Sequence, residues 1–299
     1  MKSYKLKTGN SETYKITTKE DFELQTKNSD KYVYIGTDGI KRGLAVCPSC
    51  DNPVRILGLY KPLSDRQPYA QHHNKSTQIA VFSSENYKHC PYSNPNAKQK
   101  FDISSIKKAP SDFEKSLYYE MRDYFDKVIY LLNKKLDIYI SYDFAQRLLT
   151  TFVNCYGYCD SMATHYNLPW ILMDSIQSFN LIGRCVKRNS KLWTFLSKRK
   201  DIKLIPNKKR TEYEYIQSSI NNYVFLKGSF FAHTRRIDEN DNLDEIITFG
   251  VVDSEDVPAN WIFKQKYPID EFYFSNLCKN TDYRNQNLLD LAKELMNDI

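Results

Sequence analysis

Long apolar runs are missing from this sequence of 299 residues. The longest, such as LPWILM at residues 168–173, are far shorter than the ~20 residues that a membrane-spanning helix needs. The N-terminus, MKSYKLKTGNSETYK, has no apolar stretch of the kind found in secretory signals, so we expect a soluble, cytoplasmic bacterial protein with no membrane partner. Glycine and proline are scarce while lysine, asparagine and tyrosine abound. Because AT-rich genes produce this usage, a high lysine count is by itself weak evidence for binding.

The common nucleotide-binding and hydrolase motifs are also missing. The sequence contains no G-x-x-x-x-G-K-[ST], G-x-G-x-x-G, H-E-x-x-H or G-x-S-x-G pattern. Their absence disfavours P-loop chemistry, Rossmann cofactor use and the usual hydrolase mechanisms. Hydrophobic residues make up 41% and charged residues 26% of the chain, which is within the globular range, and the length allows two ordinary domains.

Positive charge is concentrated in one segment. Residues 184–210 carry 11 Lys and Arg residues against a single acid, Asp201, whereas residues 237–299 carry 5 against 14 acids. Such a concentration is typical of a surface that neutralises nucleic-acid phosphates, although a solvated helix face with a basic loop gives the same pattern. The candidate nucleic-acid-binding residues are Arg184, Lys187, Arg188, Lys191, Lys198, Arg199, Lys200, Lys208, Lys209 and Arg210.

Aromatic residues intermingle with this basic segment. Trp193, Phe195, Tyr213 and Tyr215 lie within it or just after it. This mixture suits stacking on single-stranded bases, while packing into a hydrophobic core is the ordinary alternative.

The cysteines are spaced for a metal ion. Cys47 and Cys50 form a C-P-S-C knuckle and Cys90 lies in H-C-P-Y, in a segment with few other ordering features. Two cysteines separated by two residues can bind one ion, and a distant segment must complete a tetrahedral structural site. His72 is the preferred fourth ligand and His73 the alternative. The sequence thus predicts a structural Zn²⁺ bound by three thiolates and an imidazole. The competing interpretation is a set of buried free thiols beside surface histidines.

Around these ligands the sequence resembles known zinc segments. The fragments C-P-S-C at 47–50, P-V-R-I at 53–56, Y-A-Q-H-H at 69–73 and H-C-P-Y at 89–92 resemble the zinc-binding segment of uncharacterised bacterial proteins. More loosely, they are similar to the N-terminal zinc segment of CoiA-type competence proteins. The resemblance implies metal ligands at these cysteines and histidines, and a setting in phage defence, mobile elements or DNA uptake. In the competence family a nuclease-like domain follows, but its acidic and lysine positions have no match in residues 111–299.

Residues 1–46 are predicted to form β structure. Two apolar-alternating runs within 31–46 are joined through the Asp-Gly pair at 38–39, which favours a hairpin turn. The second run leads directly into Cys47, so the knuckle is expected at the end of a strand. Residues 51–110 show little periodicity, and a metal would explain how so long a segment is ordered.

Helical spacing dominates after residue 110. Ser111 and Glu114 form a capping box before a long amphipathic helix over 112–134. Further helices are expected from Ser141, near Pro169, over 190–199 and around 288–295, with a β-hairpin formed by 223–237 and 245–252. The fold class is therefore α+β: an N-terminal β-hairpin and zinc module, a helical region, and a C-terminal β-hairpin plus helix.

Two domains are predicted. Residues 1–100 form an N-terminal β and zinc-binding module, and residues 111–299 form an α+β main domain. The main domain is expected to be mainly helical over 111–200, with the β-hairpin and terminal helix over 215–299. The segment 91–110, rich in Pro, Asn and Lys, is the best boundary.

Three further groups have both a functional and an ordinary interpretation. Cys155 and Cys159, with His165 close by, could hold a second metal or form a Cys–His nucleophile pair. Residue types and spacing alone favour ordinary buried thiols, because no fourth ligand is evident.

The second group is the acidic cluster after the apolar run ITFGVV. Asp253, Glu255 and Asp256 could hold Mg²⁺ for phosphodiester cleavage. Acidic residues that end a strand give the same pattern, so no catalytic residue is assigned.

The third group lies on a predicted strand. Alternation places His233 and Arg235 on one face and Arg236 on the other. If the first face is exposed, it extends the phosphate-binding surface; ordinary surface arginines explain the pattern equally well.

The leading hypothesis is a zinc-containing component that binds nucleic acid or takes part in an assembly. The alternatives are a metal-dependent nuclease, and a protein-interaction module that meets an acidic partner or another copy of itself. Backbone binding predicts an affinity that falls steeply with salt, whereas a nuclease predicts Mg²⁺-dependent cleavage that Asp253→Ala abolishes. An interaction module predicts a defined complex and no affinity for nucleic acid at ~150 mM salt.

Overall fold

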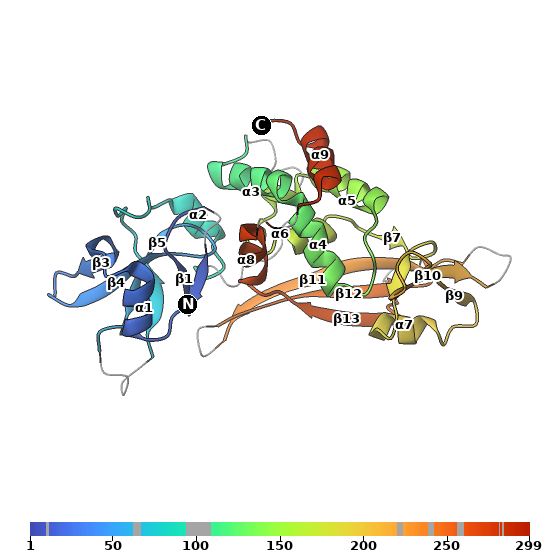
Figure 1. The fold of residues 1–299 in the computed structure, drawn as a ribbon, viewed down its shortest axis with the longest axis horizontal. Helices are drawn as coiled ribbons and strands as arrows, with labels where there is room; N and C mark the ends of the chain where they lie inside the picture. The colour runs from blue at the N-terminus through green and yellow to red at the C-terminus, as the bar shows by residue number, and fades with distance from the viewer. Residues whose placement is uncertain are drawn as a thin grey trace.

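The computed structural model describes residues 1–9, 12–61, 67–93, 109–219, 224–238, 242–255, 260–280, 282 and 284–299. Helices combine with antiparallel sheets, so the fold is α+β as predicted (Figure 1). Among these residues, every helix is too short or too polar to cross a lipid bilayer.

The N-terminal region is built on an antiparallel sheet with the strand order β2-β1-β4-β5-β6, and β3 also pairs with β4. Its elements are β1 (Ser3–Lys5), β2 (Thr13–Lys15), α1 (Lys19–Thr26), β3 (Val33–Ile35), β4 (Lys41–Val46), β5 (Pro53–Leu57), β6 (Tyr69–His72) and α2 (Ser84–His89). The predicted hairpin is confirmed, since β3 pairs with β4 and Gly39 in the turn has a φ of 70°. Because β4 ends at Val46, Cys47 follows a strand as expected.

One expectation for this region is wrong, and one segment has more regular structure than its pattern indicated. Residues 1–46 are not entirely β structure, because α1 begins after Thr18, whose side chain accepts a hydrogen bond from the Asp21 N–H. Of this helix only Phe22 and Thr26 are buried, so its apolar periodicity is weak. The described part of residues 51–110 contains β5, β6 and α2, regular elements that its weak periodicity did not indicate.

The main region begins with two helices where one was predicted. The capping box is confirmed: Ser111 Oγ accepts from the Glu114 N–H at 3.2 Å, and Glu114 Oε2 accepts from the Ser111 N–H at 2.7 Å. Helix α3 (Asp112–Asp123) then ends, and α4 (Phe125–Lys135) begins after Tyr124, whose φ of −124° is not helical. Both helices bury their apolar faces, so the pattern continues across the break.

The other predicted helices are present, with shifted ends. They are α5 (Tyr142–Asn154), α6 (Leu168–Asp174), α7 (Lys191–Leu196) and α9 (Gln286–Leu295), and α8 (Tyr273–Lys279) is an additional helix. Ser141 caps α5 by accepting from the Phe144 N–H, and Pro169 lies in the first turn of α6.

Two antiparallel sheets complete the main region. Their strands are β7 (Phe179–Asn180), β8 (Cys185–Lys187), β9 (Ile202–Pro206), β10 (Tyr213–Ser218), β11 (Lys227–Ile237), β12 (Leu243–Val252) and β13 (Phe263–Pro268). The sheet orders are β13-β12-β11-β7 and β8-β10-β9. The β11–β12 hairpin is confirmed, with a shift of register between Phe231 and Thr234. The smaller sheet was not predicted, and with α7 it forms the end of the molecule farthest from the N-terminal region (Figure 1).

Polar contacts join the two regions. Ser3 Oγ donates to Glu271 Oε2 at 3.1 Å, and the Tyr92 hydroxyl donates to the same oxygen. Lys279 Nζ lies 3.7 Å from Glu12 Oε2. The buried apolar side chains that are described form one cluster within residues 1–90 and a larger one within 113–296. The division into domains stays a prediction, because most of the proposed boundary lies outside the described residues.

Candidate metal centre

Three separate segments bring the predicted ligands together. Cys47 follows β4, and Cys50 closes the turn that leads into β5. His72 is the last residue of β6, where it pairs across the sheet with Val54. Cys90 ends α2, and its backbone N–H donates to the Tyr87 carbonyl at 3.2 Å. Strand pairing and helix termination therefore fix all four positions.

The ligand atoms lie at the separations that a tetrahedral ion requires. Cys47 Sγ is 3.7 Å from Cys90 Sγ, and His72 Nε2 is 3.3 Å from Cys50 Sγ and 3.5 Å from Cys90 Sγ. All four atoms lie within 4.8 Å of one another. Tetrahedral zinc, with bonds of about 2.3 Å to sulfur and about 2.0 Å to nitrogen, places sulfur atoms about 3.8 Å apart and sulfur and nitrogen about 3.5 Å apart. The donor set and its spacing thus fit one metal ion.

The structure distinguishes between the two candidate histidines. His72 directs Nε2 toward the sulfurs, and its ring meets the Tyr87 ring edge-on at 5.0 Å. His73, the next residue, lies outside the cluster, with its ring 5.1 Å from that of Tyr34. Successive residues of a strand point to opposite faces, which explains why only one of the pair reaches the site.

Asn52 links the cysteine knuckle to helix α2. Its side chain donates to Cys50 Sγ at 3.3 Å and to the Ser83 carbonyl at 3.0 Å, and it accepts from the Ser83 N–H at 2.6 Å. Asn86 Nδ2 adds a bond to the Cys50 carbonyl at 3.2 Å. Groups that hold a ligand in this way orient it toward the metal and typically matter for affinity.

Burial dominates the electrostatics of the three thiols. It raises the pKa of Cys50 and Cys90 well above the ordinary value. For Cys47 burial acts in the same direction, but hydrogen bonds from the other two thiols and the nearby His72 outweigh it and lower the pKa. Without a cation, the cluster therefore favours a thiolate at Cys47 and neutral thiols at Cys50 and Cys90.

The second predicted cysteine group does not form a metal site. His165 Nδ1 contacts Glu120, and Cys155 Sγ donates to the Phe152 carbonyl at 3.7 Å. Burial raises the pKa of Cys159, as does the adjacent Glu114. Within the described part of the chain, a search for groups of His, Cys, Asp and Glu at metal-binding spacing finds the Cys47–Cys90 cluster and no other.

The acidic group after β12 is held by cations. Asp253 Oδ2 accepts from Arg199 at 2.9 Å, and Glu255 Oε1 lies 3.8 Å from Lys227 Nζ. Asp256 lies outside the described residues. The two carboxylates that are described are therefore engaged separately.

Most of the predicted basic residues are exposed. Lys187, Lys191, Lys198, Lys200, Lys208 and Lys209 present their side chains to solvent around β8, α7 and the turn between β9 and β10. Arg188 pairs with Glu214 at 2.9 Å, and Arg199 pairs with Asp201 and Asp253 at 2.7 and 2.9 Å. Of the aromatic residues near them, Tyr213 is buried and Phe195 packs 5.2 Å from Phe263, whereas Tyr215 is exposed.

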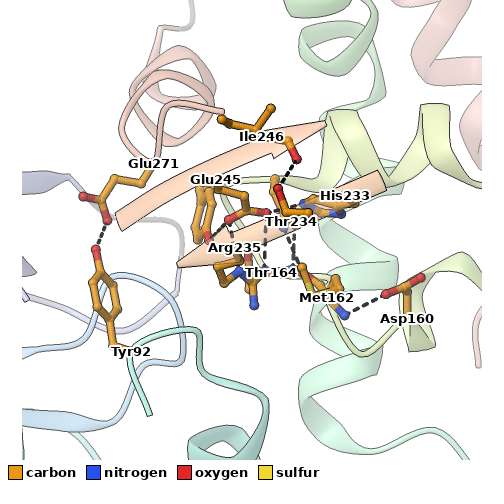
Figure 2. A network of polar contacts seen from close by, with 12 residues as sticks. Tyr92, Asp160, Met162, Thr164, His233, Thr234, Arg235, Glu245, Ile246 and Glu271 are labelled. Atoms are coloured by element: carbon orange, nitrogen blue, oxygen red, sulfur yellow. Dashed lines mark hydrogen bonds and ion pairs between the residues drawn. The ribbon is translucent and has the colours of Figure 1, made fainter. Parts of the chain in front are cut away.

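A buried polar network is the feature that the sequence did not reveal. Glu245 of β12 accepts from Asn167 Nδ2 at 2.7 Å, from Arg235 Nε at 3.2 Å, and from the Tyr166 hydroxyl, and it lies 2.5 Å from His233 Nε2. Figure 2 shows His233, Arg235 and Glu245 of the hairpin lying together, with Met162 and Thr164 of the loop before α6 beside them. Burial acts to raise the pKa of Glu245, but Arg235 and the other donors lower it to about 2.

This network corrects one prediction. His233 and Arg235 do share a face and Arg236 lies on the other, as alternation predicts. The shared face is buried, however, so it does not extend a phosphate-binding surface. The sequence did contain one indication of this buried network. Arg235 and Glu245 lie opposite each other on the two strands of the hairpin, and oppositely charged residues in such register can pair.

No protein-family model, no curated protein and no solved structure matches this chain.

Proposed function

We propose that this protein binds the nucleic-acid backbone through its basic end and uses a structural zinc ion to order its N-terminal region. The basic end comprises β8, α7, β9 and β10 with the turns between them. The observation that carries the proposal is the weak neutralisation of its cations. Among the described residues, Arg188 and Arg199 alone, of the predicted basic set, form ion pairs with acids.

In the described part of the chain, the acidic C-terminal region forms little direct charge pairing with this surface. Between the two charged segments, the described residues form a single ion pair, from Arg199 to Asp253. The remaining lysines of the basic end can therefore contact phosphates. Each such contact releases counterions from the nucleic acid, and this release is the main source of affinity in such complexes. Net positive potential at one end also speeds encounter with a polyanion.

Zinc is supported by the donor set. Three thiolates and one imidazole, with every coordination position supplied by protein, are typical of structural rather than catalytic zinc. Cys47, Cys50 and Cys90 belong to the small hydrophobic cluster of the N-terminal region, so an ion there crosslinks β4, β6 and α2 through its core. Structural zinc in small modules contributes on the order of 10 kcal/mol.

Nuclease activity is less well supported. A metal-dependent nuclease needs carboxylates that converge on an ion, whereas Asp253 and Glu255 each face a different cation. A protein-interaction role makes a different prediction for the experiment below, since it requires no affinity for nucleic acid.

The test is the salt dependence of binding. Fluorescence anisotropy of the full chain with labelled DNA and RNA is expected to give an affinity that falls steeply with salt and does not need Mg²⁺. A triple variant, Lys191→Ala, Lys198→Ala and Lys208→Ala, is expected to lower the salt slope by roughly 2 to 3. The matched control replaces Lys75, Lys88 and Lys293, which are exposed elsewhere. No affinity at ~150 mM salt would overturn the proposal.

A further inference from the structure

A grooved surface adjoins the basic end. One hollow of about 430 Å³ is lined by one side of α4, the segment that leads into α5, and the cap and first turn of α9. A second, of about 220 Å³, is lined by Gly183, Arg184 and the turn between β9 and β10. The two hollows share Tyr139, Ser141 and Arg210, so they lie side by side, and together they are called the groove below.

Cations line the smaller hollow. The Arg184 guanidinium lies 3.9 Å from the centre of the Phe144 ring, and that of Arg210 lies 4.3 Å from the Tyr139 ring. Lys209 joins them from the turn. None of these cations forms an ion pair within the described residues. Burial and the nearby Arg147 lower the pKa of Arg184, and Asp143 partly opposes them.

Exposed tyrosines follow the same groove. Tyr130 and Tyr142 line the larger hollow and are 38% and 47% exposed, and Tyr215 lines the smaller one and is 39% exposed. Large aromatic rings are usually buried, and those left at a surface often mark a binding site. The acid in this lining, Asp126, is already held by Arg284 at 2.8 Å, so it does not repel an anion strongly.

We propose that this groove binds a single-stranded nucleic acid, with phosphates near Arg184, Lys209 and Arg210 and unpaired bases stacked on the exposed tyrosines. The inference rests on the proposed function and specifies the nucleic acid that is bound as single-stranded. Base faces are accessible only when a strand is unpaired, and cationic grooves with aromatic platforms bind such strands with little dependence on sequence. A duplex hides its base faces, so it can use the cations but not the tyrosines.

The experiment compares the binding of single-stranded and duplex nucleic acid, and tests the exposed tyrosines by substitution. Full-length protein is titrated against a labelled single strand of about 20 nucleotides and against the duplex of the same sequence, at ~150 mM salt. Tyr142→Ala and Tyr215→Ala are each expected to weaken single-strand binding roughly 5- to 100-fold and to leave duplex binding nearly unchanged. Tyr142→Trp is expected to retain affinity, since it preserves stacking. Tyr156→Ala is the matched control, because Tyr156 is 42% exposed but lines neither hollow.

The outcomes separate this inference from the proposed function. The proposed groove is supported if the protein prefers the single strand, if the tyrosine variants lose this preference, and if 2-aminopurine placed in the strand is quenched on binding. The groove is overturned if single strand and duplex bind equally well and the tyrosine variants bind both as the wild type does. That result would still be consistent with backbone binding. Binding of neither form overturns both.

Discussion

Replacement of Arg235 by methionine should strongly destabilise the protein, whereas the same change at Arg236 should not. The two arginines are neighbours on β11, but the Arg235 side chain is 0% exposed and that of Arg236 is 75% exposed. Each pairs with a carboxylate on β12, Glu245 and Asp244 respectively. The pair of variants therefore compares a buried with an exposed ion pair at almost the same place in the fold.

The magnitude follows from the environment of Glu245. Its pKa of about 2, against an ordinary value of 4.5, corresponds to roughly 3 kcal/mol of stabilisation of the ionised form. Removal of one partner from a buried ion pair usually costs about 3 to 5 kcal/mol, because the other charge is left uncompensated. Loss of Arg235 also removes one of the two described donors to the Met162 carbonyl, at 2.6 Å, and leaves Asn167 Nδ2 at 2.8 Å. For Arg236→Met we expect less than about 1 kcal/mol.

The pH dependence gives the argument a second readout. In the wild type, the contribution of Glu245 is present above pH 4.5 and is lost as the pH falls toward 2. Without Arg235, burial should raise the folded pKa, so stability should fall as the pH rises above 4.5. Urea unfolding followed by circular dichroism between pH 4 and 8 should show a deficit that grows with pH for Arg235→Met and stays constant for Arg236→Met. A deficit below about 1 kcal/mol that does not vary with pH would refute the reasoning.

Two further predictions concern the metal-bearing region and the helical region. Asn52→Ala should weaken zinc affinity roughly 10- to 100-fold, because it removes the hydrogen bond to the Cys50 sulfur. Competition with a chromogenic chelator measures this affinity. His73→Ala should leave the affinity unchanged, and an equal effect of both variants would contradict the assignment of ligands. Ser111→Ala should lower the free energy of unfolding by about 1 kcal/mol, since it removes the cap of α3, and an unchanged urea midpoint would show that the cap contributes nothing.

Local chemistry made parts of this fold predictable. The capping box at Ser111, the turn at Gly39 and the cysteine spacing each act over a few residues, and the structure contains all three features. The break between α3 and α4 was hidden because the apolar pattern runs on through Tyr124. Strands β9 and β10 were missed because they are only five and six residues long and follow a strongly basic stretch. Their place in the sheet comes from pairing, since β10 lies between β8 and β9.

The buried network and the groove depend on contacts between distant segments. Glu245 meets Tyr166 and Asn167 from 79 and 78 residues away along the chain, which no short pattern encodes. The groove likewise joins Tyr142 to Tyr215 through elements that are separate in sequence. The same limit applied to the fourth metal ligand, where spacing left His72 and His73 open and the direction of β6 separated them.

The metal content of the purified full-length chain tests the central claim most directly. Elemental analysis should find one zinc per chain in the wild type and in Cys155→Ser, whose sulfur lies outside the cluster, and little or none in Cys47→Ser. Loss of zinc should be accompanied by loss of the ordered N-terminal region, because the proposed ion would crosslink its core. Freshly purified, folded protein without zinc, or zinc retained in full by Cys47→Ser, would contradict the account.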